Sequence, residues 1–205
     1  MTEVRTWVIF STAGLIWLTL IILGAVSGNP EQFRTISDVV PFLLILLGLF
    51  ERFLWRWGFI PRLVNVPVLH GTWKGELESL WTDPATGKSP PKKIVYLAVD
   101  QTMTSLCLRL LSDESASDQV AGSLTHPASG PRIVSAVYVN TPTVGRRDGS
   151  PMHYGGLVLR VAGAFPPRRL EGEYWTDRQS KGALAFDAHS SKTADSFADA
   201  QELFR

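Results

Sequence analysis

Hydrophobic residues are distributed along the chain in two different ways. The first sixty positions hold long apolar runs, whereas from Val68 onward apolar and polar residues alternate between clusters of Gly, Pro, Asn, Asp and Ser. Long apolar runs are typical of membrane or deep core segments, and period-two alternation is typical of strands with one buried face. The pattern therefore predicts a membrane-anchoring domain at 1–60, a linker at 61–67 and a strand-rich domain at 68–205.

Two apolar runs occupy the first domain. Residues 7–26 carry no charge and are long enough to cross a bilayer as a helix, with a secretory signal as the alternative. Residues 39–49 alone are as short as a core helix. Their continuation over 50–60 remains largely apolar and places Trp55 and Trp57 where a headgroup belt is expected. We therefore expect two transmembrane helices.

The basic residues predict how this hairpin is oriented. Arg5 precedes the first run, Arg34 lies in the connector at 27–38, and three arginines, at positions 52, 56 and 62, follow the start of the second run. Because Lys and Arg are enriched in cytoplasmic loops, this distribution places both termini in the cytoplasm.

The second domain alternates as a series of antiparallel strands without helices between them. An up-and-down eight-stranded barrel is the predicted fold, with a β-sandwich as the alternative. Phe197, Ala200 and Phe204 then predict a short C-terminal helix, with Thr193 or Asp195 as its N-cap. The expected strands are 69–79, 93–100, 103–111, 120–125, 132–140, 152–161, 169–177 and 182–189.

The seventh strand separates its residues by chemistry. Because side chains alternate between the faces of a strand, an acidic face and a mixed face result. We assign the acidic face to solvent, since buried unpaired carboxylates are costly. The inward face is then apolar at first and hydrogen-bonding at its end, as in a ligand pocket. The outward residues are Glu171, Glu173, Trp175 and Asp177, and the inward residues are Leu170, Gly172, Tyr174, Thr176 and Arg178.

Strand direction predicts where this pocket opens. In an antiparallel barrel the odd-numbered strands end at one rim, and their following loops are basic and aromatic. Arginine binds phosphate well and aromatic rings stack on bases, so this rim suits a small bis-phosphate with stackable rings. Loop cations that merely keep the domain soluble are the alternative. The rim holds Trp81, Lys88, Lys92, Lys93, Arg146, Arg147, Arg178 and Lys181, with Asn140, His153 and Tyr154 at flanking strand ends.

Composition narrows the function classes. A net charge of +1 argues against a partner such as a DNA or RNA polymer. The single Cys107, which we expect in the core, excludes an internal disulfide, and the four histidines lack metal-ligand spacing. Without a nucleophile elbow or phosphate loop, we expect no enzyme and no cofactor. A lipocalin-like tethered barrel for an apolar ligand is one alternative, and a hydrolase that uses His153 is another.

Two segments carry a resemblance to a known family. HGTWKGEL at 70–77 and GEYWTDRQSKGALAF at 172–186, behind two apolar runs, resemble the SMODS-associated two-transmembrane, β-strand-rich effectors of bacterial CBASS anti-phage defence. The resemblance extends over essentially the whole chain. It implies a cytosolic barrel that binds a cyclic dinucleotide, and a partner CD-NTase that makes this ligand. It also implies that the chain itself has no catalytic role.

The resemblance also implies a membrane function and a set of ligand contacts. Ligand binding would drive homo-oligomerisation and disruption of the bacterial inner membrane, which gives abortive infection. The GEYWTDR segment corresponds to Tyr174, Trp175, Thr176 and Arg178, and the resemblance places the cyclic dinucleotide at Thr176 and Arg178. Tyr174, on the same inward face, is a further candidate. Strand direction adds Tyr154 and Asn140 as candidates. Trp73, whose ordinary role would be core packing, is added as a possible stacking platform.

Overall fold

The computed structural model describes residues 14–15, 17–19, 21–22, 30–82, 87–125, 130–163 and 165–205. The chain divides into two units, which are described separately. One contains Met1–Val64 with Thr102–Ser105, and the other contains Asn65–Gln101 with Leu106–Arg205. Most of the first apolar run, 7–26, lies outside the described residues.

The first unit contains a helix longer at its start and shorter at its end than predicted. Helix α2 spans Pro30–Arg52, so residues 30–38, which we assigned to a connector, are helical. Pro30 suits the first turn of the helix, because a backbone N–H at this position would have no acceptor within the helix and its absence costs nothing. A 3-10 turn, η1 (Leu54–Arg56), and the short helix α3 (Ile60–Leu63) follow.

The second apolar run is therefore not one helix through residue 60. Arg56 Nη2 donates to the Arg52 carbonyl at 3.0 Å, which satisfies one of the carbonyls left at the end of α2. Trp55 is fully buried, whereas Trp57 is 66% exposed, so only one of the two expected belt tryptophans presents its ring. Within the described ranges, no helix has both the length and the apolar character needed to span a bilayer.

Glu51 is held by hydrogen bonds inside this first unit. Its Oε1 accepts from Thr102 Oγ1 at 2.6 Å, from Thr104 Oγ1 at 2.7 Å and from Thr104 N at 3.1 Å. Its backbone carbonyl accepts from Met103 N at 3.1 Å. Since charge-assisted hydrogen bonds are stronger than neutral ones, the carboxylate is well compensated.

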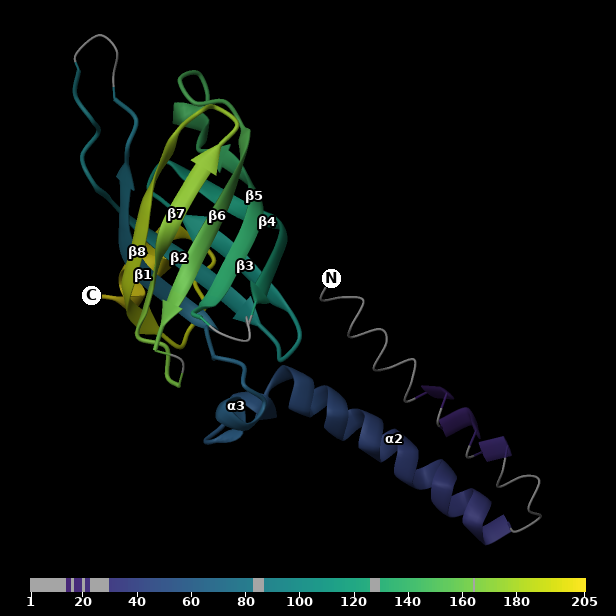
Figure 1. The fold of residues 1–205 in the computed structure, drawn as a ribbon. Coiled ribbons are helices and arrows are strands. Elements are labelled where there is room, and N and C mark those ends of the chain that lie inside the picture. Colours follow the sequence, from purple (N-terminus) through teal and green to yellow (C-terminus); the bar gives the residue numbers. More distant parts are fainter. Residues whose placement is uncertain are drawn as a thin grey trace. The chain divides into compact units, whose positions relative to one another are not determined.

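The second unit confirms the predicted eight-stranded antiparallel barrel (Figure 1). Each strand pairs with the next, and β8 returns to pair with β1, so the sheet is a closed barrel rather than a sandwich. The strands are β1 (Gly71–Ser79), β2 (Lys93–Gln101), β3 (Leu106–Leu111), β4 (Ser115–Thr125), β5 (Arg132–Pro142), β6 (His153–Ala162), β7 (Arg169–Thr176) and β8 (Lys181–Ser190).

Side-chain parity in β7 follows the sequence prediction. Leu170 and Tyr174 are buried, whereas Glu171, Glu173 and Trp175 are exposed. The inward residues of all eight strands fill the barrel with aliphatic and aromatic side chains. Burial of this apolar surface is the main force that stabilises the closed sheet.

A bulge in β4 explains why the start of this strand was predicted wrongly. The register of β4 against β5 shifts between Gln119 and Ala121, and Val120 is 62% exposed. The Gln119 side chain replaces the missing β3 pairing: Leu108 N donates to Oε1 at 3.0 Å, and Nε2 donates to the Leu106 carbonyl at 2.9 Å. The strand therefore begins five residues before the apolar position that we took as its start.

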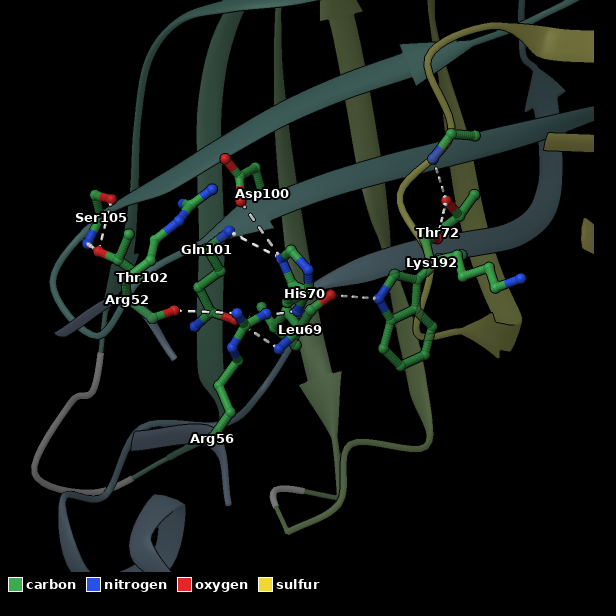
Figure 2. Close-up of polar contacts among 12 residues, drawn as sticks. Arg52, Arg56, Leu69, His70, Thr72, Asp100, Gln101, Thr102, Ser105 and Lys192 are labelled. Atoms are coloured by element: carbon green, nitrogen blue, oxygen red, sulfur yellow. Dashed lines mark hydrogen bonds and ion pairs between the residues drawn. The ribbon is translucent and has the colours of Figure 1, made fainter. Parts of the chain in front are cut away.

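Gln101 at the end of β2 fastens the segment that enters β1. Its Oε1 accepts from Leu69 N at 2.7 Å and from His70 N at 3.2 Å, and its Nε2 donates to the Pro67 carbonyl at 3.0 Å. Figure 2 shows the Gln101 side chain directed at Leu69 and His70. Because Gln101 is only 2% exposed, these bonds satisfy polar groups that water does not reach.

A short helix, α4 (Phe197–Leu203), closes the chain and lies beside β2 and β3. Its N-cap is Ser196, which accepts from Asp199 N at 3.1 Å, and not Thr193 or Asp195. The ring of Tyr96 contacts Phe197 and Phe204, two of the three residues that predicted this helix. Cys107 was expected in the core but is exposed, because it faces outward from β3.

A cationic cavity at one end of the barrel

A cavity of about 630 Å³ occupies the end of the barrel at which the odd-numbered strands terminate. Figure 1 shows β1 and β7 directed to this same end. The volume lies within the range of small-molecule sites. The lining comprises Leu77, Ser79, Trp81, Pro90, Pro91, Lys93, Val95, Leu110, Ser112, Glu114, Ser115, Ser117, Tyr138, Asn140, Pro142, Gly145, Arg146, Gly149, Ser150, His153, Tyr174, Thr176, Arg178 and Ser180.

Two tyrosines on neighbouring walls occupy space that glycines provide. Tyr138 pairs across the sheet with Gly155, and Tyr174 pairs with Gly182. A Cβ on Gly155 would lie 2.4 Å from Tyr138 Cζ, and one on Gly182 would lie 2.7 Å from Tyr174 Cε1. Both glycines therefore leave the space that the two rings occupy beside the wall of the cavity.

The Tyr138 hydroxyl is held in its neutral form. Burial, together with smaller contributions from the neighbouring Tyr174 and Asp177, raises the pKa of Tyr138 to about 12. A buried phenolate is unfavourable because the low-dielectric interior solvates its charge poorly. Near neutral pH, Tyr138 can therefore donate a hydrogen bond into the cavity.

Asn140 organises a wall of serine hydroxyls. Its Nδ2 donates to Ser115 Oγ at 2.9 Å and to Ser117 Oγ at 2.8 Å. Asn140 and Ser117 are buried, so these bonds compensate polar groups removed from water. Each serine oxygen that accepts from Asn140 keeps its own proton, which it can donate to another acceptor.

Thr176 and Arg178 lie at the end of β7 and in the turn after it. Thr176 Oγ1 lies 2.7 Å from Ser180 Oγ, and Arg178 Nη1 donates to Ser150 Oγ at 2.8 Å. The strand ends at Thr176, so Arg178 is an exposed turn residue and not an inward strand residue as predicted. The guanidinium is exposed to water, so its place in the fold does not by itself require an anionic partner.

Glu114 bridges the other two cations of the cavity. Its Oε2 pairs with Lys93 Nζ, and its Oε1 lies 3.2 Å from Arg146 Nη2. The hydrogen bond from Lys93 lowers the pKa of Glu114, and the charges of Lys93 and Arg146 add to this effect against the opposing influence of burial. The carboxylate is thus ionised at neutral pH.

The cavity as a whole suits a dianion. Lys93, Arg146 and Arg178 against one Glu114 leave a net charge of +2 when His153 is neutral. Guanidinium and ammonium groups bind phosphate oxygens through charge-assisted hydrogen bonds. In the described part of the chain, no cluster of three His, Cys, Asp or Glu side chains is arranged to hold a metal ion.

Four of the six predicted ligand contacts come together in this cavity: Asn140, Tyr174, Thr176 and Arg178. Tyr154 does not line it. His153 faces inward, so the next side chain projects outward, and Tyr154 is 54% exposed with its backbone bonded to Asp177. The four lining residues stay predictions as ligand contacts.

Trp73 also lies outside the lining. It faces inward but stands six positions before the end of β1, about 20 Å along the strand from Ser79. Its indole Nε1 donates to the Leu69 carbonyl at 2.9 Å, and the side chain is 1% exposed. These contacts match the core role that we named as its ordinary alternative.

Only some of the residues predicted for the rim line the cavity. Trp81, Lys93, Arg146, Arg178, Asn140 and His153 line the cavity, whereas Lys88, Lys92, Arg147 and Lys181 do not. Lys92 instead pairs with Glu78 at 3.0 Å. Sequence reasoning missed Tyr138, Glu114 and the serines of β4. The alternation of Ser115 and Ser117 before the bulge was the available signal, and it would have moved the start of β4 to this rim.

The polar lining also bears on the alternative of an apolar ligand. A lipocalin-like site would be apolar up to its mouth, but here serines, an asparagine and three cations surround the opening above Leu77, Val95 and Leu110. His153, the residue of the hydrolase alternative, has its Nδ1 3.0 Å from the Pro151 carbonyl.

Comparison with known proteins agrees with this geometry. No curated protein matches the chain. The family model described as Cap15, cyclic dinucleotide receptor domain, matches residues 64–188. The matched segment includes every cavity-lining residue and more than half of the chain. The chain therefore belongs to the Cap15 cyclic dinucleotide receptor family of CBASS effectors.

Proposed function

We propose that the cavity at the end of the barrel is the cyclic dinucleotide site of this receptor. The observation that carries the proposal is a net charge of +2 around a space of about 630 Å³, which complements the two phosphates of such a ligand. In this arrangement Arg178, Lys93 and Arg146 bind phosphate oxygens, and Thr176 and Asn140 with its serines position the ligand.

The aromatic side chains give the bases their place. Tyr174 and Trp81 line the same cavity as the cations. Stacking on such rings contributes about 1–3 kcal/mol per base and tolerates different bases. We therefore assign recognition of the bases to stacking and recognition of the ribose-phosphate ring to the charged and hydroxyl groups.

We further propose that the chain acts at the bacterial inner membrane. The uncharged run at 7–26 and the apolar run at 39–49 support a membrane anchor, and the arginine distribution supports cytoplasmic termini. A partner CD-NTase supplies the ligand during infection. The ligand shifts the population toward an assembled state by binding it better, and the assembly disrupts the membrane.

Ligand titration tests the first proposal. The purified full-length chain is titrated with cyclic di-GMP, cyclic di-AMP and cyclic GMP–AMP by calorimetry. Arg178→Ala should weaken binding by at least about tenfold, because it removes a charged hydrogen-bond donor. Arg160→Ala, which changes an exposed arginine outside the cavity lining, is the control and should bind as the native chain does.

Two results would contradict this assignment. Binding of none of the three dinucleotides would remove the ligand class tested. Equal affinity of Arg178→Ala and Arg160→Ala would place the ligand elsewhere on the chain.

Cell experiments test the membrane proposal. Co-expression with a CD-NTase that makes the bound ligand should depolarise the inner membrane, and Arg178→Ala should delay depolarisation. Recovery of the chain in the soluble fraction, or a stable membrane potential throughout co-expression, would argue against membrane disruption.

A further inference from the structure

Glu114 occupies an unexpected place for a carboxylate in a pocket for phosphates. Its side chain comes from the turn between β3 and β4, Lys93 opens β2, and Arg146 ends the 3-10 turn η2 (Val144–Arg146). Each of its two oxygens pairs with a different cation. One carboxylate thus satisfies two of the three cations that line the cavity.

The backbone around Glu114 is firmly placed. Glu114 N donates to Ser112 Oγ at 3.3 Å, and its carbonyl accepts from Thr143 N at 2.9 Å. The turn is closed by Ser112 N, which donates to the Ser115 carbonyl at 2.9 Å. The local structure therefore holds the carboxylate beside Lys93 and Arg146.

The third cation has a different partner. Arg178 donates to the neutral hydroxyl of Ser150, not to a carboxylate. A phosphate can replace that hydroxyl without displacing a paired carboxylate from Arg178. A phosphate that approaches Lys93 or Arg146 instead meets a negative charge at contact distance, and it must share or take these cations.

We infer that Glu114 is a built-in competitor of ligand phosphate for Lys93 and Arg146, and that it lowers the affinity of the cavity for phosphate-bearing molecules. Discrimination of this kind uses a repulsive element against abundant alternatives. Inorganic phosphate and mononucleotides would then bind in the cavity more weakly than they would without the Glu114 carboxylate. A cyclic dinucleotide also gains from stacking and from Arg178, so it tolerates the competition.

The inference rests on the proposed function for the identity of the ligand, but its first test does not. The full-length chain and Glu114→Gln are titrated with inorganic phosphate and followed by ³¹P NMR. Removal of one negative charge near a protein surface should tighten phosphate binding about tenfold. Glu78→Gln is the matched control, because Glu78 pairs with Lys92 outside the cavity lining and should leave phosphate affinity unchanged.

The same variants are then titrated with the three cyclic dinucleotides. Tighter binding of inorganic phosphate by Glu114→Gln, and by Glu114→Ala as a second variant, supports the inference. Unchanged or weaker phosphate binding by both variants overturns it, since Glu114 would then only position Lys93 and Arg146. Loss of cyclic di-GMP alone, with phosphate affinity unchanged, also overturns it and would indicate that the carboxylate accepts from guanine. Failure of all three dinucleotides with tighter phosphate binding refutes the ligand class and leaves the competitor role standing.

Discussion

Alkaline pH should destabilise the barrel through one identifiable group, Tyr138. The pKa of Tyr138 is raised to about 12 in the folded chain, whereas a tyrosine in an unfolded chain has a pKa of about 10. Between these values the unfolded chain loses the proton and the folded chain keeps it. The stabilising contribution is therefore complete below pH 10 and is lost as the pH rises toward 12.

The size of the effect follows from the pKa difference. A difference of about two pKa units corresponds to about 3 kcal/mol in the free energy of unfolding. That is a substantial part of the stability of an ordinary domain, which is about 5–15 kcal/mol. Tyr138→Phe has no ionisable hydroxyl at this position, so it should lack this part of the loss of stability at alkaline pH.

Urea unfolding of the full-length chain between pH 9 and pH 12, about the range set by the two pKa values, measures the effect. Native chain, Tyr138→Phe and Tyr154→Phe are compared, because other tyrosines and lysines titrate over the same range. Tyr154 is exposed, so its variant should retain the full alkaline loss. Near-ultraviolet absorbance of tyrosinate follows the proton directly.

One result would refute this reasoning. If Tyr138→Phe and Tyr154→Phe lose stability along the same pH curve as the native chain, Tyr138 ionises freely in the folded state. The hydroxyl would then be in contact with water, and burial as the cause of its raised pKa would be refuted.

Two substitutions test the architecture that supports the cavity. Gln101→Leu removes the acceptor of two backbone N–H groups and should lower the free energy of unfolding by about 2–4 kcal/mol, whereas Gln201→Leu, at an exposed position of α4, should change it little. Equal urea midpoints for the two variants would contradict the bonding role of Gln101. Gly182→Ala places a Cβ 2.1 Å from a backbone oxygen of β1 and should lower the free energy of unfolding by about 2 kcal/mol. Gly145→Ala, whose Cβ meets no heavy atom within 4 Å, is the control, and thermal melting compares the two variants. An unaltered Tm for Gly182→Ala would show that β1 and β8 separate easily.

The barrel could be predicted because its strands obey a simple alternation. In β7 the exposed glutamates and the buried Leu170 and Tyr174 follow strict parity, so the inward face was evident from the residues alone. Successive antiparallel strands then placed Asn140 and Thr176 at one rim. Parity also accounts for the outward direction of Tyr154, which we had grouped with the rim by chain position only.

The remaining parts of the cavity depend on features that alternation does not reveal. The bulge beside Gln119 exposes Val120 and hides the start of β4, so Ser115, Ser117 and the Glu114 turn were taken for a loop. The pairing of Glu114 with Lys93 and Arg146 joins residues from three separate elements. Such contacts arise from closure of the sheet and have no signature in local sequence.

Closure of the sheet also limits how copies of this chain could associate. Every strand of the barrel has a hydrogen-bonded neighbour on both sides, from β1 paired with β2 around to β8 paired with β1. A free strand edge is what allows sheets from different molecules to merge, and a closed ring leaves only short unpaired stretches, such as residues 121–125 of β4, which pair with β5 but not with β3. A contact between two barrels must therefore be made by outward side chains, loops or such a short stretch, unless one of the eight strand pairings first opens.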